Sequence, residues 1–126
     1  MPISWQQSTG GRIDIVFSNP YTLEESEKTM KAIFAHPGLT RPLRLLVDVR
    51  QSTAPDTEFV VNSINFFQLH IDQMWGARIA VVVANDAQAD MGHISERSAE
   101  SRELPFTLRV FLESQRDDAE YWLQER

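Results

Sequence analysis

Cysteine is absent from the sequence, and its absence excludes several kinds of site at once. Disulfide bonds, thiolate nucleophiles and thiolate-bound metal ions all require this side chain. Glycine is also scarce, with five in 126 residues, and no glycine-rich phosphate-binding loop is present. The sequence therefore predicts neither a cysteine-dependent enzyme nor a P-loop nucleotide enzyme.

Basic residues are too few to balance the acidic ones, at 12 against 18, so the formal charge is -6 and the pI about 5.0. Surfaces that bind nucleic acids or anionic membranes normally carry the opposite sign. The longest uninterrupted apolar run, 79–84, is far too short to span a bilayer, and the N-terminus lacks a signal-peptide pattern. We therefore expect a cytoplasmic protein with no nucleic-acid partner and no stable membrane insertion.

One segment, 43–60, organises the rest of the chain. Its odd positions 43–49 are apolar, while Arg44, Asp48 and Arg50 are charged, which predicts a strand with one face in a core. The polar residues after it lead into the start of a long helix. The elements expected elsewhere are a hairpin of strands at 3–7 and 12–17, a helix from Thr22 to about His36, the long helix from between Thr53 and Asp56 to Trp75 with Gly76 as its C-cap, a strand at 78–84, a helix capped by Asp86, a strand at 106–112, and a last helix opened by Ser114 with Asp117.

Strands that alternate with helices predict βα units and a largely parallel sheet. We therefore expect a single α/β domain over residues 1–126, with a single-layer, mixed, mostly parallel sheet of about five strands. Three strands alternate apolar with polar residues, whereas a sheet covered on both faces has continuous apolar strands. This pattern predicts helices mainly on one face. Apolar residues on the second face, Val16, Leu46 and Phe111, indicate that one helix or a partner subunit covers part of it.

The chain resembles a known group at four places: 47–50, which reads Val-Asp-Val-Arg, then 77–83, 105–111 and 119–123. This pattern is similar to that of the SpoIIAA-like proteins within the STAS domains, the group of bacterial anti-sigma-factor antagonists and sulfate-transporter C-terminal domains. The most specific part is the Val110-Phe111 strand followed by a helix that ends in Trp122-Leu123. The resemblance implies a SpoIIAA/STAS-like domain over the whole chain that acts as a regulatory or binding module without intrinsic catalysis.

The resemblance also implies a candidate phosphoacceptor. In phosphorylated antagonists the strand is followed by Asp-Ser-Ser-Gly, and an ungapped match places 56–59 there, with Thr57 as the equivalent hydroxyl. Phosphate at a helix start meets unpaired N–H groups and the positive end of the helix dipole. The second Ser and the Gly are missing, however, and Glu58 adds a like charge. A Thr57 that only caps the helix is therefore the interpretation we favour.

No constellation of residues predicts an enzyme, a metal site or a cofactor. His36, His70 and His93 share no metal-ligand spacing, and no serine lies in a nucleophile elbow. The polar strand face can instead form cross-strand ion pairs among Arg12, Asp14, Arg44, Asp48, Arg50 and Arg109. Such a face is either solvated or a docking surface for a partner.

Ligands of open α/β sheets bind beyond the carboxyl ends of the strands, and the long helix carries more bulky apolar residues than one stripe requires. Two hypotheses follow. The first is a non-catalytic module that binds a protein partner or itself as a homodimer. The second is a carrier or sensor of a nonpolar, lipid-like molecule, because related CRAL-TRIO folds hold such a ligand beneath a movable helix. The residues predicted to bind the ligand or partner are Asp48, Arg50, Ser52, Thr53, Asp56, Phe59, Phe66, Asn85 and Asp86.

Overall fold

The structure, a computed structural model, describes residues 2–125 and contains one five-stranded sheet in the order β1-β2-β3-β4-β5. The first pair of strands is antiparallel and the other three pairs are parallel, which confirms the predicted mixed, mostly parallel α/β architecture. The elements in chain order are β1 (Ile3–Gln7), η1 (Thr9–Gly11), β2 (Ile13–Ser18), α1 (Leu23–Ala35), β3 (Arg44–Gln51), α2 (Thr57–Leu69), α3 (Ile71–Met74), β4 (Arg78–Val83), α4 (Asp86–Ser101), β5 (Thr107–Leu112), η2 (Glu113–Gln115) and α5 (Arg116–Gln124).

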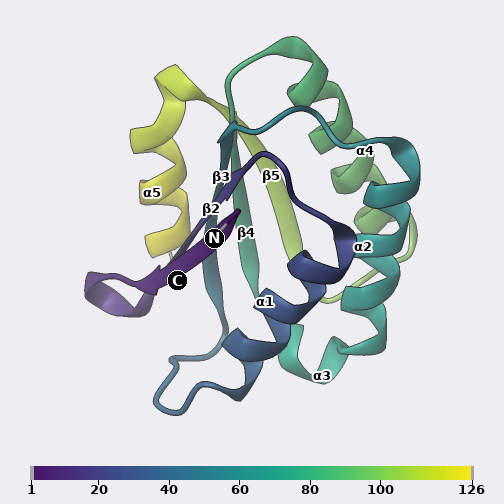
Figure 1. The fold of residues 1–126 in the computed structure, drawn as a ribbon. Coiled ribbons are helices and arrows are strands. Elements are labelled where there is room, and N and C mark those ends of the chain that lie inside the picture. The colour runs from purple at the N-terminus through teal and green to yellow at the C-terminus, as the bar shows by residue number, and fades with distance from the viewer. Residues whose placement is uncertain (1, 126) are drawn as a thin grey trace.

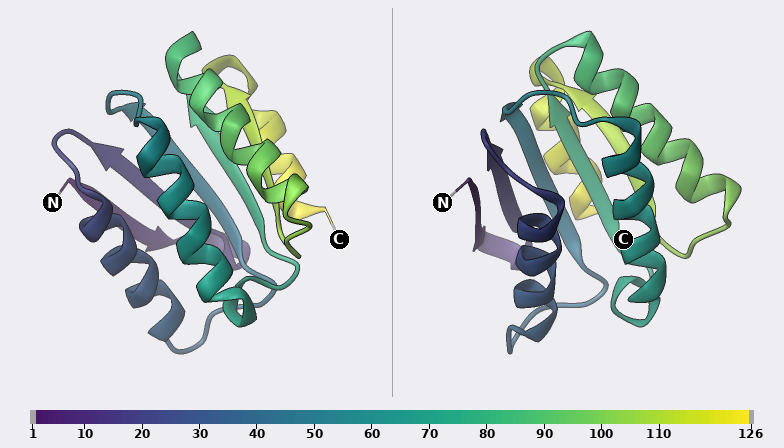
Figure 2. Two further views of the ribbon diagram at one scale, coloured as in Figure 1. Left: turned by 90° about the vertical axis from the view of Figure 1, so that its right-hand side faces the viewer. Right: turned by 45° about the vertical axis from the view of Figure 1, so that its right-hand side comes forward.

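Helices α1, α2 and α4 cover one face of the sheet, and α5 lies alone on the other (Figures 1 and 2). The parallel strands advance in one direction across the sheet, and each crossover between them is expected to be right-handed, so all three connecting helices fall on the same side. The chain after β5 is free of this constraint and places α5 on the second face. The predicted single helix over that face is therefore present.

Two apolar cores result, one on each side of the sheet. The larger core lies under α1, α2 and α4 and includes Ile13, Leu45 and Ile79. The smaller core joins the second face to α5 through Leu46, Ala80, Val82, Phe111, Ala119, Trp122 and Leu123. Strand β4 contributes to both cores, which explains why its sequence is apolar without alternation. Within residues 2–125, no helix has the length and apolar character needed to cross a membrane.

The helix predicted to continue to Trp75 is interrupted. Helix α2 ends at Leu69, His70 has non-helical backbone angles (φ -111°, ψ 36°), and the short α3 follows. The hydrophobic pattern continues through the break, because Phe67, Ile71 and Met74 all pack against the larger core. Periodicity alone therefore cannot reveal the interruption.

The helix caps were predicted with mixed success. The capping box at α1 is confirmed: the Glu25 N–H donates to Thr22 Oγ1 at 3.1 Å, and the Thr22 N–H donates to the Glu25 carboxylate at 3.0 Å. The caps assigned to Thr57, Asp86 and Ser114 are wrong. Asp56 caps α2 and Asn85 caps α4, while Ser114 lies in η2, before α5. At an N-cap, Asp is preferred over Thr, and Asn is as favourable as Asp. The sequence therefore does not fix the cap to better than one residue.

Candidate functional site

A cavity of about 150 Å³ lies between the sheet and helices α1, α2 and α4. Its floor is formed by inward-facing residues of four adjacent strands, in two rows fixed by the register of the sheet. One row contains Ile15, Val47 and Val81, and the other contains Leu45, Ile79 and Leu108. The helices supply the roof, with Met30 from α1, Phe67 from α2 and Met91 from α4 among the lining residues. The site is therefore an apolar chamber in the larger core.

Polar groups at the carboxyl ends of β2 and β3 surround a second, shallower depression beside the chamber. It is lined by Asn19, Pro20, Tyr21, Thr53, Ala54, Pro55, Asp56 and Phe59. Three of these residues, Tyr21, Pro55 and Phe59, also line the chamber, so the two spaces adjoin. The ring of Tyr21 packs edge-on against Phe59, with 5.4 Å between ring centroids. The tyrosine and phenylalanine thus form the boundary between an apolar and a polar space.

Tyr21 is held at this boundary by contacts on both sides. Its ring also packs edge-on against Phe17, at 5.1 Å between centroids, and its hydroxyl donates to the carbonyl oxygen of Thr53 at 3.3 Å. Burial raises the pKa of Tyr21, the charge of Asp56 raises it further, and a hydrogen bond with Ser52 opposes them, with a net increase. The phenol is therefore neutral at physiological pH. Sequence analysis missed Tyr21, although its position just after β2 was a usable signal.

The predicted site residues at the strand ends fall into two groups. Thr53, Asp56 and Phe59 come together at the polar depression. Ser52 is buried, and its hydroxyl donates to the carbonyl oxygen of Val49 at 2.9 Å. Asn85 caps α4, and Asp86 is exposed at the first position of that helix. Ser52 and Asn85 therefore have structural contacts, and neither lines the chamber or the depression.

Gln88 connects the end of β3 to the start of α4. Its Nε2 donates to the carbonyl oxygens of Val49 and Ser52, at 2.7 and 2.6 Å, and its Oε1 accepts from the Ala84 N–H at 2.8 Å. The side chain is buried, with 2% exposed, and all its strong hydrogen-bonding groups have partners. Gln88 lies three residues after the Asn85 cap, a spacing typical of a capping pair, which is the sequence signal that could have identified it.

Phe66 does not lie where a binding residue was expected. It is buried in the larger core, where its ring stacks on Phe34 with centroids 6.3 Å apart and contacts His70 at 4.5 Å. Phe66 lines neither the chamber nor the depression. Its bulk is explained by packing between α1 and α2, so the apparent excess of apolar residues on α2 only partly reflects the chamber.

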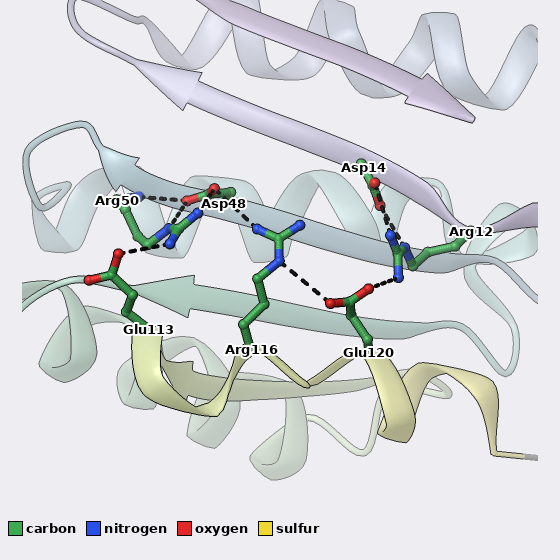
Figure 3. Close-up of polar contacts among 7 residues, drawn as sticks. All are labelled: Arg12, Asp14, Asp48, Arg50, Glu113, Arg116 and Glu120. Atoms are coloured by element: carbon green, nitrogen blue, oxygen red, sulfur yellow. Dashed lines mark hydrogen bonds and ion pairs between the residues drawn. The ribbon is translucent and has the colours of Figure 1, made fainter. Parts of the chain in front are cut away.

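The polar residues of the second face form a chain of ion pairs that runs across the sheet and onto α5 (Figure 3). Arg50 and Arg116 both contact Asp48, with N–O distances of 2.8 and 3.6 Å, and Arg12 and Arg116 both contact Glu120, at 2.7 and 3.6 Å. The members in order along the chain of contacts are Asp14, Arg12, Glu120, Arg116, Asp48, Arg50 and Glu113. We call this set the seven-residue ion chain. It connects β2 and β3 to η2 and α5.

The predicted cross-strand pairs are wrong in their partners. The two strand pairs, Arg12–Asp14 and Arg50–Asp48, form along single strands, and the other contacts reach η2 or α5 or lie within α5. Arg44 donates instead to the carbonyl oxygens of Leu43 and Gly76, and Arg109 lies over the Trp122 ring at 5.3 Å. The reason is that α5 covers this face and supplies its own charged side chains. Within residues 2–125, this face is therefore partly covered by α5 and not wholly exposed (Figure 1).

Burial tends to raise the pKa of Asp48, but hydrogen bonds from Arg50 and the charges of Arg50 and Arg116 outweigh it, so the net pKa is lowered. The hydrogen bond from Arg12 lowers the pKa of Glu120. The hydrogen bonds to Asp14 and Asp48 raise the pKa of Arg12 and Arg50, respectively. All four shifts favour the charged forms, so the residues that link the sheet to α5 do so as ion pairs at neutral pH.

Among residues 2–125, no Asp, Glu, Lys, Arg or His side chain lines the chamber, and Asp56 is the charged side chain at the depression. Thr57 is exposed at the first position of α2. His36 packs edge-on against Trp5, and His93 lies near Glu96, with 3.4 Å between His93 Nδ1 and the carboxylate. In the part of the chain that the structure describes, His, Asp and Glu side chains form no group of three or more that could hold a metal ion.

Comparison with known proteins agrees with this architecture. The sequence pattern of the family described as SpoIIAA-like matches residues 12–124. A crystal structure of an uncharacterized protein of the DUF3478 family from Shewanella loihica PV-4, described as having a SpoIIAA-like fold, superposes with a TM-score of 0.60. The two sequences are 15% identical, and the match covers 96% of this chain and 91% of the Shewanella loihica chain. No curated protein matches significantly. With the fold and the sequence pattern in agreement, the chain belongs to the SpoIIAA-like family.

Proposed function

We propose that this chain is a non-catalytic regulatory module that binds a small nonpolar molecule in the chamber beneath α1, α2 and α4. Membership of the SpoIIAA-like family supports a regulatory module in general terms, and STAS-type members are generally non-catalytic. The chamber itself is the observation that favours a ligand: well-packed interiors contain few voids larger than a water molecule, and this one adjoins a depression at the strand ends.

The size of the chamber limits the ligand. An apolar cavity of about 150 Å³ holds a molecule about the size of benzene, whereas pockets for larger ligands are typically about 300–1,000 Å³. The chamber as described therefore accommodates a single ring or a short alkyl chain. A long acyl chain requires movement of the helices that form the roof.

A variant that fills the chamber tests this proposal. Val47→Phe adds a ring at the chamber floor, and Val61→Phe is the matched control on α2, because Val61 does not line the chamber. Toluene at about ten times its Kd stabilises a binding protein by about 1.4 kcal/mol, which raises Tm by about 5 °C for a chain of this size. We expect that rise in the wild type and in Val61→Phe, and none in Val47→Phe, by differential scanning fluorimetry. No rise in the wild type, or an equal rise in all three proteins, contradicts the proposal.

Protein association is the second candidate function, and exposed apolar side chains favour it. Leu69 is the last residue of α2 and Trp75 follows α3, and their exposed fractions are 81% and 66%. Large exposed apolar side chains of this kind are enriched at interfaces. If the partner is a second copy, size-exclusion chromatography with light scattering at micromolar concentration gives twice the chain mass, and Trp75→Ser lowers it. A monomer at all concentrations contradicts self-association.

A further inference from the structure

The chamber contains no formal charge. Among residues 2–125, no Asp, Glu, Lys, Arg or His side chain lines it. A carboxylate placed inside has no cation to pair with, and burying an unpaired ion costs several kcal/mol. The adjoining depression does not compensate, because Asp56 is the charged residue in its lining and is itself negative. An anionic ligand is therefore disfavoured both in the chamber and at its border.

The chamber nevertheless contains hydroxyl groups, and most of them already have partners. The Thr29 hydroxyl donates to the Glu25 carbonyl oxygen at 2.9 Å, and the Ser95 hydroxyl donates to the Met91 carbonyl oxygen at 3.3 Å. Gln88 and Tyr21 use their donors on backbone carbonyls, as described above. These four side chains therefore have no unpaired donor to offer a ligand.

Ser26 and Ser63 differ from the other polar residues of the chamber. Both line it, one from α1 and one from α2, both are half-buried, and within residues 2–125 neither hydroxyl has a side-chain hydrogen bond. The two helices lie next to each other over the same face of the sheet (Figure 2). Each hydroxyl can donate one hydrogen bond and accept others. Both hydroxyls are therefore accessible to a ligand rather than buried without partners, because within residues 2–125 no fully buried side-chain polar atom lacks a hydrogen bond.

We propose that the chamber selects an uncharged molecule that carries one hydroxyl-type group, held by Ser26 and Ser63, over a carboxylate of the same size. This inference depends on the proposed function, because it specifies the ligand of the same chamber. It excludes free short-chain acids and favours small alcohols and phenols. The selection arises from the absence of cations together with the presence of two unpaired hydroxyls.

Toluene, phenol and benzoate test the proposal, because they share one ring and differ in the attached group. Phenol, like the tyrosine side chain, has a pKa near 10 and is neutral at pH 7, whereas benzoate is an anion. The proteins are the wild type, the Ser26→Ala/Ser63→Ala variant and the matched control Ser101→Ala, which changes an exposed serine of α4 that does not line the chamber. Binding is measured by isothermal titration calorimetry, and circular dichroism checks that each variant is folded.

We expect the wild type to bind toluene and phenol and to bind benzoate at least tenfold more weakly than phenol. The double variant is expected to bind phenol about fivefold more weakly, the effect of one net hydrogen bond of about 1 kcal/mol, and to bind toluene within twofold of the wild type. Ser101→Ala should bind both as the wild type does. Benzoate binding equal to that of phenol, or a double variant that leaves phenol unchanged or weakens toluene equally, overturns this inference while the proposed function stands. Failure of both toluene and phenol to bind the wild type overturns the proposed function as well.

Discussion

At the scale of single residues, Gly92 shows how one missing side chain sets the shape of the chamber. A Cβ at this position of α4 would lie 2.4 Å from Cγ2 of Val110 on β5, closer than real contacts allow. Gly92 therefore permits α4 to pack directly on β5, and it also lines the chamber. A glycine within a helix normally costs about 1 kcal/mol relative to alanine, so its presence here is explained by this close approach.

We predict that Gly92→Ala destabilises the protein by about 1–3 kcal/mol, because overpacking outweighs the gain in helix propensity. Urea unfolding followed by circular dichroism measures the change. The double variant Gly92→Ala/Val110→Ala removes the clashing methyl groups. Its loss of stability is expected to be smaller than the sum of the losses of the two single variants. A more stable Gly92→Ala protein would show that α4 can move away from β5 without cost.

At the scale of secondary-structure elements, the sequence was sufficient for the order of strands and helices and for the layering of the sheet. Alternation along β3, with Leu45 and Val47 on one face and Leu46 and Asp48 on the other, predicted helices mainly on one face and either one helix or a partner subunit over part of the second. The structure places one helix, α5, on the second face. These features follow from side-chain periodicity, which is a local property. The break at His70 was not predictable, because the apolar pattern continues through it.

The candidate site was less predictable, for two physical reasons. A cavity is a volume left unfilled between elements, and no residue pattern encodes it; Phe59 borders the chamber whereas Phe66, of the same type on the same helix, packs in the core. The sequence of a surface helix does not reveal whether its charged side chains are solvated or form ion pairs. Arg116 and Glu120 therefore gave no signal that they contact Asp48 and Arg12.

At the scale of the whole molecule, the seven-residue ion chain connects two strands to the last helix, so the charge state of a few carboxylates affects global stability. Asp48 is 6% exposed and contacts two guanidinium groups. Its pKa and that of Glu120 are lowered in the folded protein from ordinary values of 3.8 and 4.5. A depressed carboxylate pKa stabilises the folded state above the unfolded-state value, and the contribution is lost as the pH falls through the folded-state value.

We therefore predict that the free energy of unfolding decreases as the pH falls below about 4.5, with a slope of up to about 1.4 kcal/mol per pH unit for each additional proton bound by the unfolded chain. Urea titrations between pH 6 and pH 3 measure this slope. Asp48→Asn is expected to cost about 2 kcal/mol at pH 6, because it removes hydrogen bonds to charged partners, and to reduce the slope below pH 4.5. The control Asp90→Asn changes an exposed carboxylate of α4 that makes no ion pair within residues 2–125. If Asp48→Asn and Asp90→Asn have the same pH dependence as the wild type, Asp48 does not contribute to the acid sensitivity.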